Sequence, residues 1–357
     1  MGSVTLYRSF HPGETPSRWK DVMQGVCAKS IEKRFEDDLP IRQGAIQAWT
    51  AFTSSLFHTA SKEIRIGKDG WYYTTEEFQY FPDGPREIEK KLTLIQDIST
   101  FLSRHHIALV VALLPAKARL YPEHLYLIDF PESKIPLYEN TIAALRERGI
   151  HAPDLLPVYE QYRRHALAFP RTDTHWSPGM AAEVASTLAA YVRKIPEISL
   201  PTAEFKTSLL PEEEYIGDLP KRMVPTGVYG RWVGPFPEKL VRQKTEKIEK
   251  DQDDALFGDE AIPIVLVGTS YSAGENWNFD GALKTAFQAD VLNMAIKGRG
   301  PLFPLDEFFK TTDFENAPPK LVIWEIPERS LEVAYDHEIE IPVTLKKLRA
   351  AGLEELP

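Results

Sequence analysis

The spacing of apolar residues divides most of the chain into amphipathic helices and buried strands. Apolar side chains recur at helical intervals in four segments, each predicted to be a helix: 85–105, 139–148, 178–191 and 279–287. Short continuous apolar runs predict buried strands at 107–114, 262–267, 290–295 and 321–324. Helices that alternate with fully apolar strands are typical of an α/β fold with a mainly parallel sheet.

Three regions depart from this alternation. Residues 1–60 show helical apolar spacing, and we expect an N-terminal helical extension ahead of a single domain at 61–357. The turn chemistry of 67–70, followed by aromatic residues at 71–73, predicts a short strand or hairpin. Residues 196–260 look irregular, and the mixed charges at 238–254 predict a solvated helix within a long surface excursion.

Composition excludes several classes of function. The 357 residues are 43% hydrophobic and carry a formal net charge of -10, which argues against passive nucleic-acid binding. The single cysteine, Cys27, excludes an internal disulfide and a cysteine-based zinc site. No apolar run is long enough to cross a membrane. We interpret Met1-Gly2-Ser3 as a vector-derived start, so a targeting or anchoring segment ahead of it would be missing from this sequence.

Two short polar segments supply candidate catalytic groups. Ser270 follows the predicted strand at 262–267, and Gly268 permits a sharp turn at the carboxyl end of that strand, where α/β sheets bind ligands. A serine hydroxyl needs a histidine to accept its proton and a carboxylate to orient that histidine. Asp173 and His175, on a loop before a predicted helix, offer both groups. The three residues are therefore a candidate catalytic triad.

Each segment also has a simpler interpretation. Glycine and serine after a strand often form a plain turn, and an Asp-x-His pair often forms a loop or helix-cap hydrogen-bond network. A metal site at Asp173 and His175 is disfavoured, because no third ligand occurs at a recognisable spacing. We predict no metal and no cofactor.

Several segments resemble the alginate O-acetyltransferase family, the AlgJ-like and AlgX proteins related to SGNH hydrolases. They are 67–71 (Gly-Lys-Asp-Gly-Trp), 114–123 (Leu-Pro-Ala-Lys-Ala-Arg-Leu-Tyr-Pro-Glu), 171–176 (Arg-Thr-Asp-Thr-His-Trp), 267–272 (Val-Gly-Thr-Ser-Tyr-Ser) and 323–329 (Ile-Trp-Glu-Ile-Pro-Glu-Arg). The Asp-x-His spacing, and its position before the serine, fit the transferases. In ordinary SGNH hydrolases the serine comes first and the spacing is Asp-x-x-His.

The resemblance implies an SGNH hydrolase-like three-layer α/β/α sandwich and a Ser270–His175–Asp173 triad. It implies transfer of acetyl through an acyl-serine onto an exopolysaccharide, most simply the mannuronate residues of alginate. It also implies a periplasmic protein, which an N-terminal segment absent from this sequence would anchor to the inner membrane. A membrane-bound O-acyltransferase would be the acetyl donor, and other exopolysaccharide secretion proteins would be partners. Because only a short stretch follows Trp324, we expect the AlgJ-like layout without the carbohydrate-binding module that ends AlgX proteins, with a truncated AlgX protein as the alternative.

Further residues are candidates for the oxyanion and acceptor sites. The Ser270 N–H and the Asn293 side chain, at the end of the next strand, are the predicted oxyanion donors. Residues next to the triad are predicted to contact the acceptor sugar, with core packing as the alternative for the two tryptophans: Trp176, Tyr271 and Trp277. Lys297 and Arg299 are predicted to pair with uronate carboxylates, with a solvated turn as the alternative.

Three alternative functions stay open at the level of sequence. A carbohydrate acetylesterase would use the same triad, because both activities pass through an acyl-enzyme. Another exopolysaccharide, such as acetylated cellulose, is a possible acceptor. A non-catalytic binding protein that keeps the fold would position polysaccharide for another subunit.

Overall fold

The computed structural model describes residues 63–221, 235, 237–248, 262–311, 314, 316–335, 344 and 346. The predicted helical extension at 1–60 lies outside the described residues, and the single-domain assignment of 61–357 stays a prediction. None of the helices within the described ranges combines the length and the apolar character that a membrane span requires.

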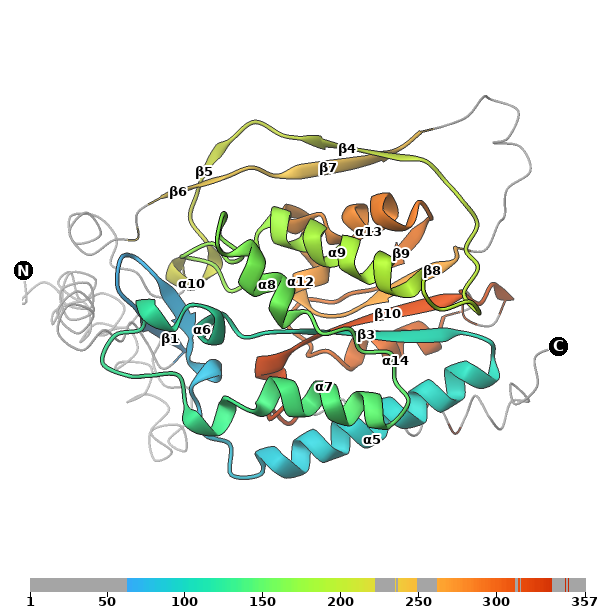
Figure 1. Cartoon of the computed structure of the whole chain (residues 1–357), viewed down its shortest axis with the longest axis horizontal. Helices are drawn as coiled ribbons and strands as arrows, with labels where there is room; N and C mark the ends of the chain where they lie inside the picture. The colour runs from blue at the N-terminus through green and yellow to red at the C-terminus, as the bar shows by residue number, and fades with distance from the viewer. Residues whose placement is uncertain are drawn as a thin grey trace, which may run out of the picture.

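A four-stranded parallel sheet forms the centre of the molecule (Figure 1). Its order is β3 (Ala108–Leu114), β10 (Leu321–Pro327), β8 (Ile264–Val267) and β9 (Val291–Asn293). All three neighbouring pairs are parallel, so the carboxyl ends of the strands lie along one edge. This arrangement confirms the four strands predicted from their apolar runs.

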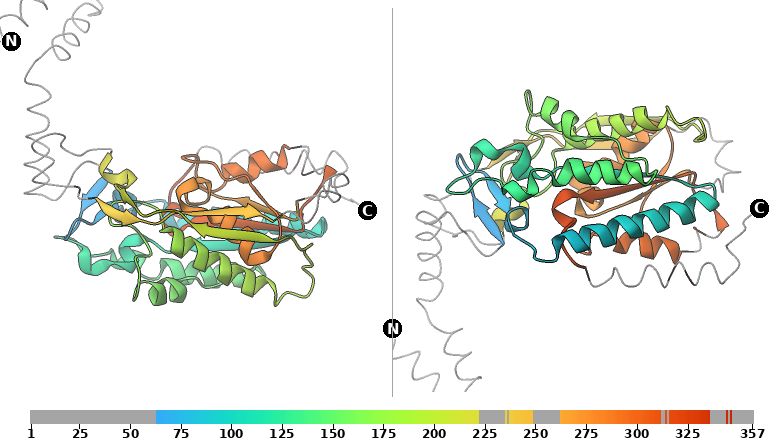
Figure 2. Two further views of the ribbon diagram at one scale, coloured as in Figure 1. Left: turned by 90° about the horizontal axis from the view of Figure 1, so that it is seen from above. Right: turned by 60° about the horizontal axis from the view of Figure 1, so that its bottom comes forward.

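Helices cover both faces of the sheet. Successive strand residues point to opposite sides, and because the central strands are apolar along most of their length, both faces must be buried. One face packs against α8 (Leu156–Tyr162), α9 (Pro178–Val192) and α13 (Phe279–Phe287). The other packs against α5 (Gly84–Arg104), α7 (Leu137–Glu147) and α14 (Phe303–Phe309). Figure 2 shows these layers from two further directions. The predicted three-layer α/β/α sandwich and its four predicted helices are confirmed, whereas the short helices α8 and α14 were not predicted.

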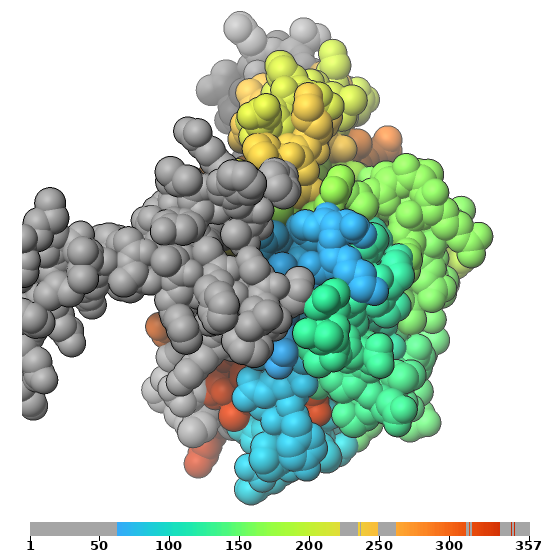
Figure 3. Space-filling model, turned by 90° about the vertical axis from the view of Figure 1, so that its left-hand side faces the viewer, coloured from blue at the N-terminus to red at the C-terminus, as the bar shows by residue number. Residues whose placement is uncertain are grey.

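A small hairpin stands at one end of the sheet. Strands β1 (Ile64–Ile66) and β2 (Tyr72–Thr74) pair antiparallel, which confirms the predicted hairpin, and η1 (Thr75–Glu77) follows. The chain that leaves β3 runs to the same end and forms three short elements: α6 (Lys117–Leu120), η2 (Pro122–His124) and η3 (Glu132–Lys134). Figure 3 shows the blue hairpin beside this blue-green segment.

An antiparallel two-stranded arm replaces part of the predicted irregular region (Figure 1). Its strands are β4 (Phe205–Leu209) paired with β7 (Gln243–Lys247), and β5 (Glu213–Tyr215) paired with β6 (Glu238–Leu240). The short helix α10 (Asp218–Lys221) follows β5. The helix predicted at 238–254 is therefore wrong over its described part. That segment has no apolar stripe for a helix to bury, whereas Thr245 pairs with Thr207 through a 2.8 Å hydroxyl contact across the ladder.

Candidate active site

Ser270 lies at the turn that follows β8, at the carboxyl edge of the sheet. Thr269 is the N-cap of the short helix α12 (Ser270–Ala273), and its hydroxyl accepts a hydrogen bond from the Tyr271 N–H. Ser270 is the first residue of this helix, and the first N–H groups of a helix have no partner within the helix. The turn thus presents a hydroxyl and a backbone donor at the same residue.

A buried carboxylate holds this turn through hydrogen bonds. Glu325, on the neighbouring strand β10, has no exposed surface, and its Oε2 accepts hydrogen bonds from the Thr269 N–H at 2.7 Å and the Ser272 hydroxyl at 3.0 Å. Burial raises the pKa of Glu325, and these hydrogen bonds oppose the rise. A side chain at Gly268 would meet Glu325 Oε2 at 2.6 Å. Gly268 is therefore needed for space rather than for an unusual turn, since its φ is not in the left-handed region.

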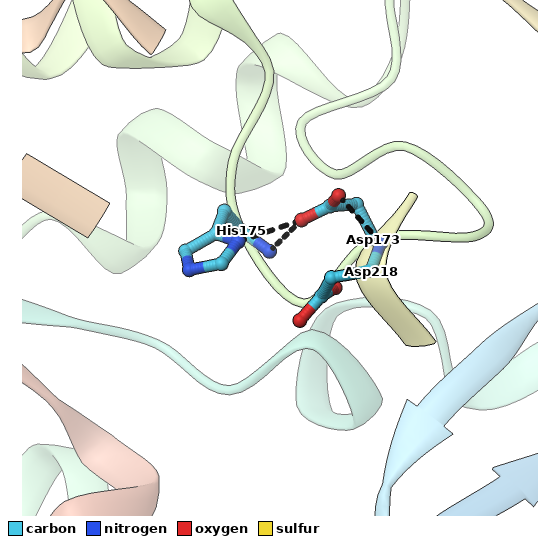
Figure 4. Close-up of side chains that lie close together, drawn as sticks. All are labelled: Asp173, His175 and Asp218. Atoms are coloured by element: carbon cyan, nitrogen blue, oxygen red, sulfur yellow. Dashed lines mark hydrogen bonds and ion pairs between the residues drawn. The ribbon is translucent and has the colours of Figure 1, made fainter. Parts of the chain in front are cut away.

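His175 joins the serine to Asp173. Its Nε2 lies 2.7 Å from Ser270 Oγ, and its Nδ1 lies 2.7 Å from Asp173 Oδ1. Figure 4 shows the imidazole directed at the Asp173 carboxylate, with Asp218 beside them. The structure brings together the three residues predicted from two distant segments, and their contacts have the geometry of a nucleophile, base and orienting acid.

The Asp173 carboxylate is satisfied on both oxygens. Oδ1 also accepts from the His175 backbone N–H at 2.8 Å, and Oδ2 accepts from the Tyr215 hydroxyl at 2.5 Å and the Asp218 N–H at 3.0 Å. Burial alone would raise the pKa of Asp173. The hydrogen bonds and charge of His175, together with the Tyr215 hydroxyl, outweigh burial and hold that pKa well below its usual range. The acid is therefore ionised whenever the imidazole is able to act as a base.

The arm holds the loop that carries Asp173 and His175. The Asp218 carboxylate accepts from the Thr174 N–H at 2.8 Å and the Thr174 hydroxyl at 3.0 Å. Glu238 accepts from the N–H groups of Arg171 and Thr172, at 2.9 and 3.0 Å. Gly217 allows the close approach, because a side chain there would meet the Thr172 carbonyl oxygen at 2.2 Å. The loop has no regular structure of its own and takes its shape from these contacts.

Asp173, His175 and Asp218 also form a cluster of possible metal ligands, with ligand atoms within 4.8 Å of one another. Their polar atoms already have protein partners. His175 faces Asp173 with one ring nitrogen and Ser270 with the other, and Asp218 accepts from Thr174. The donor set thus fits a hydrogen-bonded relay better than a metal centre.

The aromatic residues next to the triad are buried, which favours core packing, the alternative interpretation of the two tryptophans. Trp176 is wholly buried and packs against Tyr271 and Phe279, so the predicted sugar contact is corrected to core packing. Tyr271 is 3% exposed and donates its hydroxyl to the Thr174 carbonyl, which leaves it little surface for a sugar. Trp277 stacks on the His175 ring, with centroids 5.5 Å apart and planes 27° apart, and is also 3% exposed. It forms a wall of the imidazole site.

The residues predicted to bind oxyanion and acceptor lie after β9. Asn293 donates its side-chain N–H to the Ser272 carbonyl at 2.8 Å, so its amide braces the nucleophile helix; a role at the oxyanion stays a prediction. The chain then runs beside the serine turn, since the Ile296 N–H donates to the Gly268 carbonyl at 3.1 Å. Lys297 and Arg299 follow and are exposed, with the Arg299 guanidinium 4.3 Å from the centre of the Phe303 ring.

Sequence reasoning missed the residues that support the triad. One signal was present: Glu325 is a charged residue within the apolar run 321–327. Tyr215, Asp218 and Glu238 gave no signal, because they belong to a region whose strands were not predicted.

Comparison with known proteins agrees with this geometry. The family model of the SGNH hydrolase-like domain, acetyltransferase AlgX, matches residues 64–328. The probable alginate O-acetylase AlgJ of Pseudomonas aeruginosa is 37% identical over 349 residues, which cover 96% of this chain and 89% of that protein. The corresponding protein of Azotobacter vinelandii is 37% identical over 336 residues, covering 94% of this chain and 86% of its own.

A solved structure of the O-acetyltransferase domain of Pseudomonas putida AlgJ matches with a TM-score of 0.71 and 33% identity, covering 81% of this chain and 99% of that one. Pseudomonas aeruginosa AlgX matches with a TM-score of 0.58 and 28% identity, covering 74% of this chain and 62% of that one. The expected resemblance is confirmed, and this chain belongs to the family of SGNH hydrolase-like acetyltransferases that includes AlgX and AlgJ.

Proposed function

We propose that this protein transfers an acetyl group through an acyl-serine onto a hydroxyl of an exopolysaccharide, with mannuronate residues of alginate as the acceptor. The observation that carries the proposal is the relay from Ser270 Oγ through His175 to Asp173, with 2.7 Å at each of its two contacts. The choice of alginate is supported by the relatives that are named alginate O-acetylases.

The first half of the reaction acetylates the serine. His175 Nε2 accepts the Ser270 proton as Oγ attacks the carbonyl carbon of the acetyl donor, and Asp173 stabilises the resulting imidazolium. The tetrahedral intermediate collapses when the bond to the donor's leaving group breaks, and the imidazolium returns the proton to that group. The product is Ser270 acetylated on Oγ.

The second half repeats these steps with the acceptor. A sugar hydroxyl gives its proton to His175 and attacks the acetyl carbon, and Ser270 Oγ leaves and regains the proton from the imidazolium. In both halves the negative oxygen of the tetrahedral intermediate needs fixed donors. The Ser270 N–H at the start of α12 is the first of them, and we retain Asn293 as a candidate for the second.

Transfer exceeds hydrolysis only where water is kept from the ester and the sugar is held in place. Trp277 covers one face of the His175 ring and Tyr215 packs edge-on against Trp277, with centroids 6.2 Å apart. Lys297 and Arg299 lie exposed at the same edge of the sheet, where they would pair with uronate carboxylates of the acceptor. This arrangement supports an anionic sugar polymer as the substrate.

The finer biological setting follows from the same proposal. An acetyl donor is required, and we propose a membrane-bound O-acyltransferase that supplies the group on the periplasmic side, together with other exopolysaccharide secretion proteins as partners. We also propose a periplasmic location, with anchoring by a segment outside this sequence.

The test is mass spectrometry of oligomannuronate incubated with the protein and an activated acetyl ester, beside the Ser270→Ala variant. Sugars that gain acetyl groups only with the native protein would support the proposal. Ester consumption without sugar modification would replace it with an acetylesterase using the same triad, or with another acceptor polymer. Absence of any serine-dependent ester consumption would overturn the acyl-serine mechanism.

A further inference from the structure

Two segments that resemble the family have no part in the reaction described above: 67–71 and 114–123. In the structure they meet at one residue. Lys117 begins helix α6, just after the carboxyl end of β3, and only 1% of its surface is exposed. A buried lysine is unusual unless its charge and its N–H groups have defined partners.

The three hydrogen-bond acceptors of Lys117 lie on the loop that carries Asp173 and His175, called the triad loop below. Its Nζ donates to the carbonyl oxygens of Pro170 at 2.8 Å, Arg171 at 2.9 Å and Asp173 at 2.8 Å. An ammonium group has three N–H donors, so these three carbonyls satisfy it completely. Three carbonyls from one short stretch of chain are thus drawn to a single point, and the last of them is the carbonyl of the catalytic acid.

The hairpin completes the site around this ammonium. The Trp71 and Tyr73 rings lie with their centroids 5.1 and 5.5 Å from Nζ, at cation–π distance. Between them, the Tyr72 N–H donates to the same Arg171 carbonyl that Lys117 contacts, at 2.9 Å. The hairpin and Lys117 of the segment 114–123 therefore act together on the segment 171–176.

Burial and the surrounding carboxylates have opposite effects on the charge of Lys117. Burial lowers its pKa to about 8, and carboxylates on the surrounding elements oppose this shift: Glu77 on η1, Asp173 on the loop, Glu238 on β6 and Asp218 on α10. All three N–H donors are present only in the ammonium form. The complete set of bonds to the loop therefore depends on protonation of Lys117.

We propose that the Lys117 ammonium positions the Asp173–His175 pair for catalysis by gathering the carbonyls of Pro170, Arg171 and Asp173. Lys117 touches neither Ser270 nor the acceptor, so it is a positioning residue. Its effect on the reaction rests on the proposed acyl-serine mechanism, whereas its effect on loop geometry does not.

The experiment compares Lys117→Met with a matched control, Lys91→Met. Lys91 is also a buried lysine, 2% exposed, and its Nζ donates to the Val333 carbonyl at 2.6 Å, but it lies on α5, against the other face of the sheet. Both variants lose a buried ammonium and leave a carbonyl without its donor. Only Lys117→Met alters the triad loop.

Two properties are measured on the folded fraction of each variant. The first is the rate at which an activated acetyl ester acetylates Ser270. The second is the low-field proton resonance of a histidine N–H that is hydrogen-bonded to a carboxylate, which reports the His175–Asp173 contact even if no acetyl transfer occurs. We expect Lys117→Met to lower the acetylation rate about a hundredfold and to lose the resonance, with Lys91→Met within about threefold of the native protein.

The outcomes separate this proposal from the proposed function. If the native protein does not acetylate Ser270, the proposed function fails, and the resonance alone decides the role of Lys117. A Lys117→Met protein that keeps both the native rate and the resonance would overturn the positioning role, and an equal loss in Lys91→Met would reduce it to general stability.

If Lys117→Met does not fold, the native protein decides by its pH dependence. A reversible loss of Ser270 acetylation as the Lys117 ammonium loses its proton at raised pH, with unchanged circular dichroism, would support the proposal. A rate that stays constant while Lys117 is deprotonated would contradict it.

Discussion

The two halves of the triad are built in different ways. Ser270 stands at the end of a strand in a buried parallel sheet, and contacts that hold its turn come from the two neighbouring strands, through Glu325 on β10 and Asn293 on β9. His175 and Asp173 stand on a loop without regular structure. The groups that hold this loop come from segments far away in the sequence, namely Lys117, Tyr215, Asp218 and Glu238.

This difference shows that the nucleophile and the base with its acid are positioned by different kinds of contact. The position of the nucleophile follows from the register of the sheet, which is fixed by the whole hydrophobic core. The position of the base and its acid depends on a few polar side chains, none of which lies in a strand of the central sheet. Single substitutions around the loop should therefore affect catalysis more than stability, and substitutions beneath the serine should affect both.

The largest expected effect comes from Asp173→Asn. An amide at this position can hold His175 in the wrong tautomer, so Nε2 would carry a proton and be unable to accept one from Ser270. We expect the rate of Ser270 acetylation, measured on the folded fraction, to fall about 10⁴-fold. Asp218→Asn alters the support of the loop but keeps the Asp173 carboxylate, so it should cost much less, and a similar loss in both variants would argue against a specific role for Asp173.

Glu325→Gln tests the contacts that hold the turn of Ser270. The Glu325 carboxylate accepts from three donors, the Thr269 N–H, the Thr269 hydroxyl and the Ser272 hydroxyl, whereas an amide offers one acceptor oxygen and adds donors of its own. We expect the free energy of unfolding to fall by about 1–3 kcal/mol and the acetylation rate to fall as well. Denaturant unfolding and acetylation kinetics measure the two effects. An unchanged free energy of unfolding would mean that the turn does not depend on this carboxylate.

Tyr215→Phe removes one donor from Asp173 and leaves the ring that packs against Trp277. A hydrogen bond to a charged group contributes enough free energy for a rate loss of about tenfold. Acetylation kinetics measure this loss. Tyr191→Phe, whose hydroxyl lies near His151, is the control and should leave the rate unchanged.

The smallest expected effect is on the pH dependence of the free energy of unfolding. Its sign for Asp173 is opposite to its sign for Glu325. The folded-state pKa of Asp173 is depressed, so this group contributes stability above its ordinary value of 3.8 that is lost as the pH falls further. The pKa of Glu325 is raised, so its contribution is present below its ordinary value of 4.5 and is lost as the pH rises. Compared with the native protein, Asp173→Asn should thus gain relative stability in acid, and Glu325→Gln should gain it at higher pH. Denaturant unfolding at several pH values checks both signs.

The contrast between the Ser270 turn and the loop of Asp173 and His175 also explains which parts of the structure could be predicted from the sequence. The Ser270 turn was predictable, because a run of four or more apolar residues followed by a glycine indicates a buried strand and a turn at its end. The central strands and long helices were predictable for the same reason. Trp176 was misassigned because proximity to His175 in the sequence does not show which way a side chain points, and here it points into the core.

The surroundings of Asp173 were not predictable in this way. The arm consists of polar strands whose partners lie tens of residues apart, such as Phe205 and Lys247, and a charged segment gives no periodic signal for such a pairing. Tyr215 and Glu238 reach the loop only because these strands pair. The Asp-x-His motif could therefore indicate the base and the acid, but not the groups that hold them.

The most direct test of the central claim is peptide mass spectrometry of the protein itself, quenched after brief exposure to an activated acetyl ester. The account predicts one acetyl group on the peptide that contains Ser270, present in the native protein, strongly reduced in Asp173→Asn and absent in Ser270→Ala. Acetylation at another residue, or ester turnover that continues undiminished in Ser270→Ala, would contradict it.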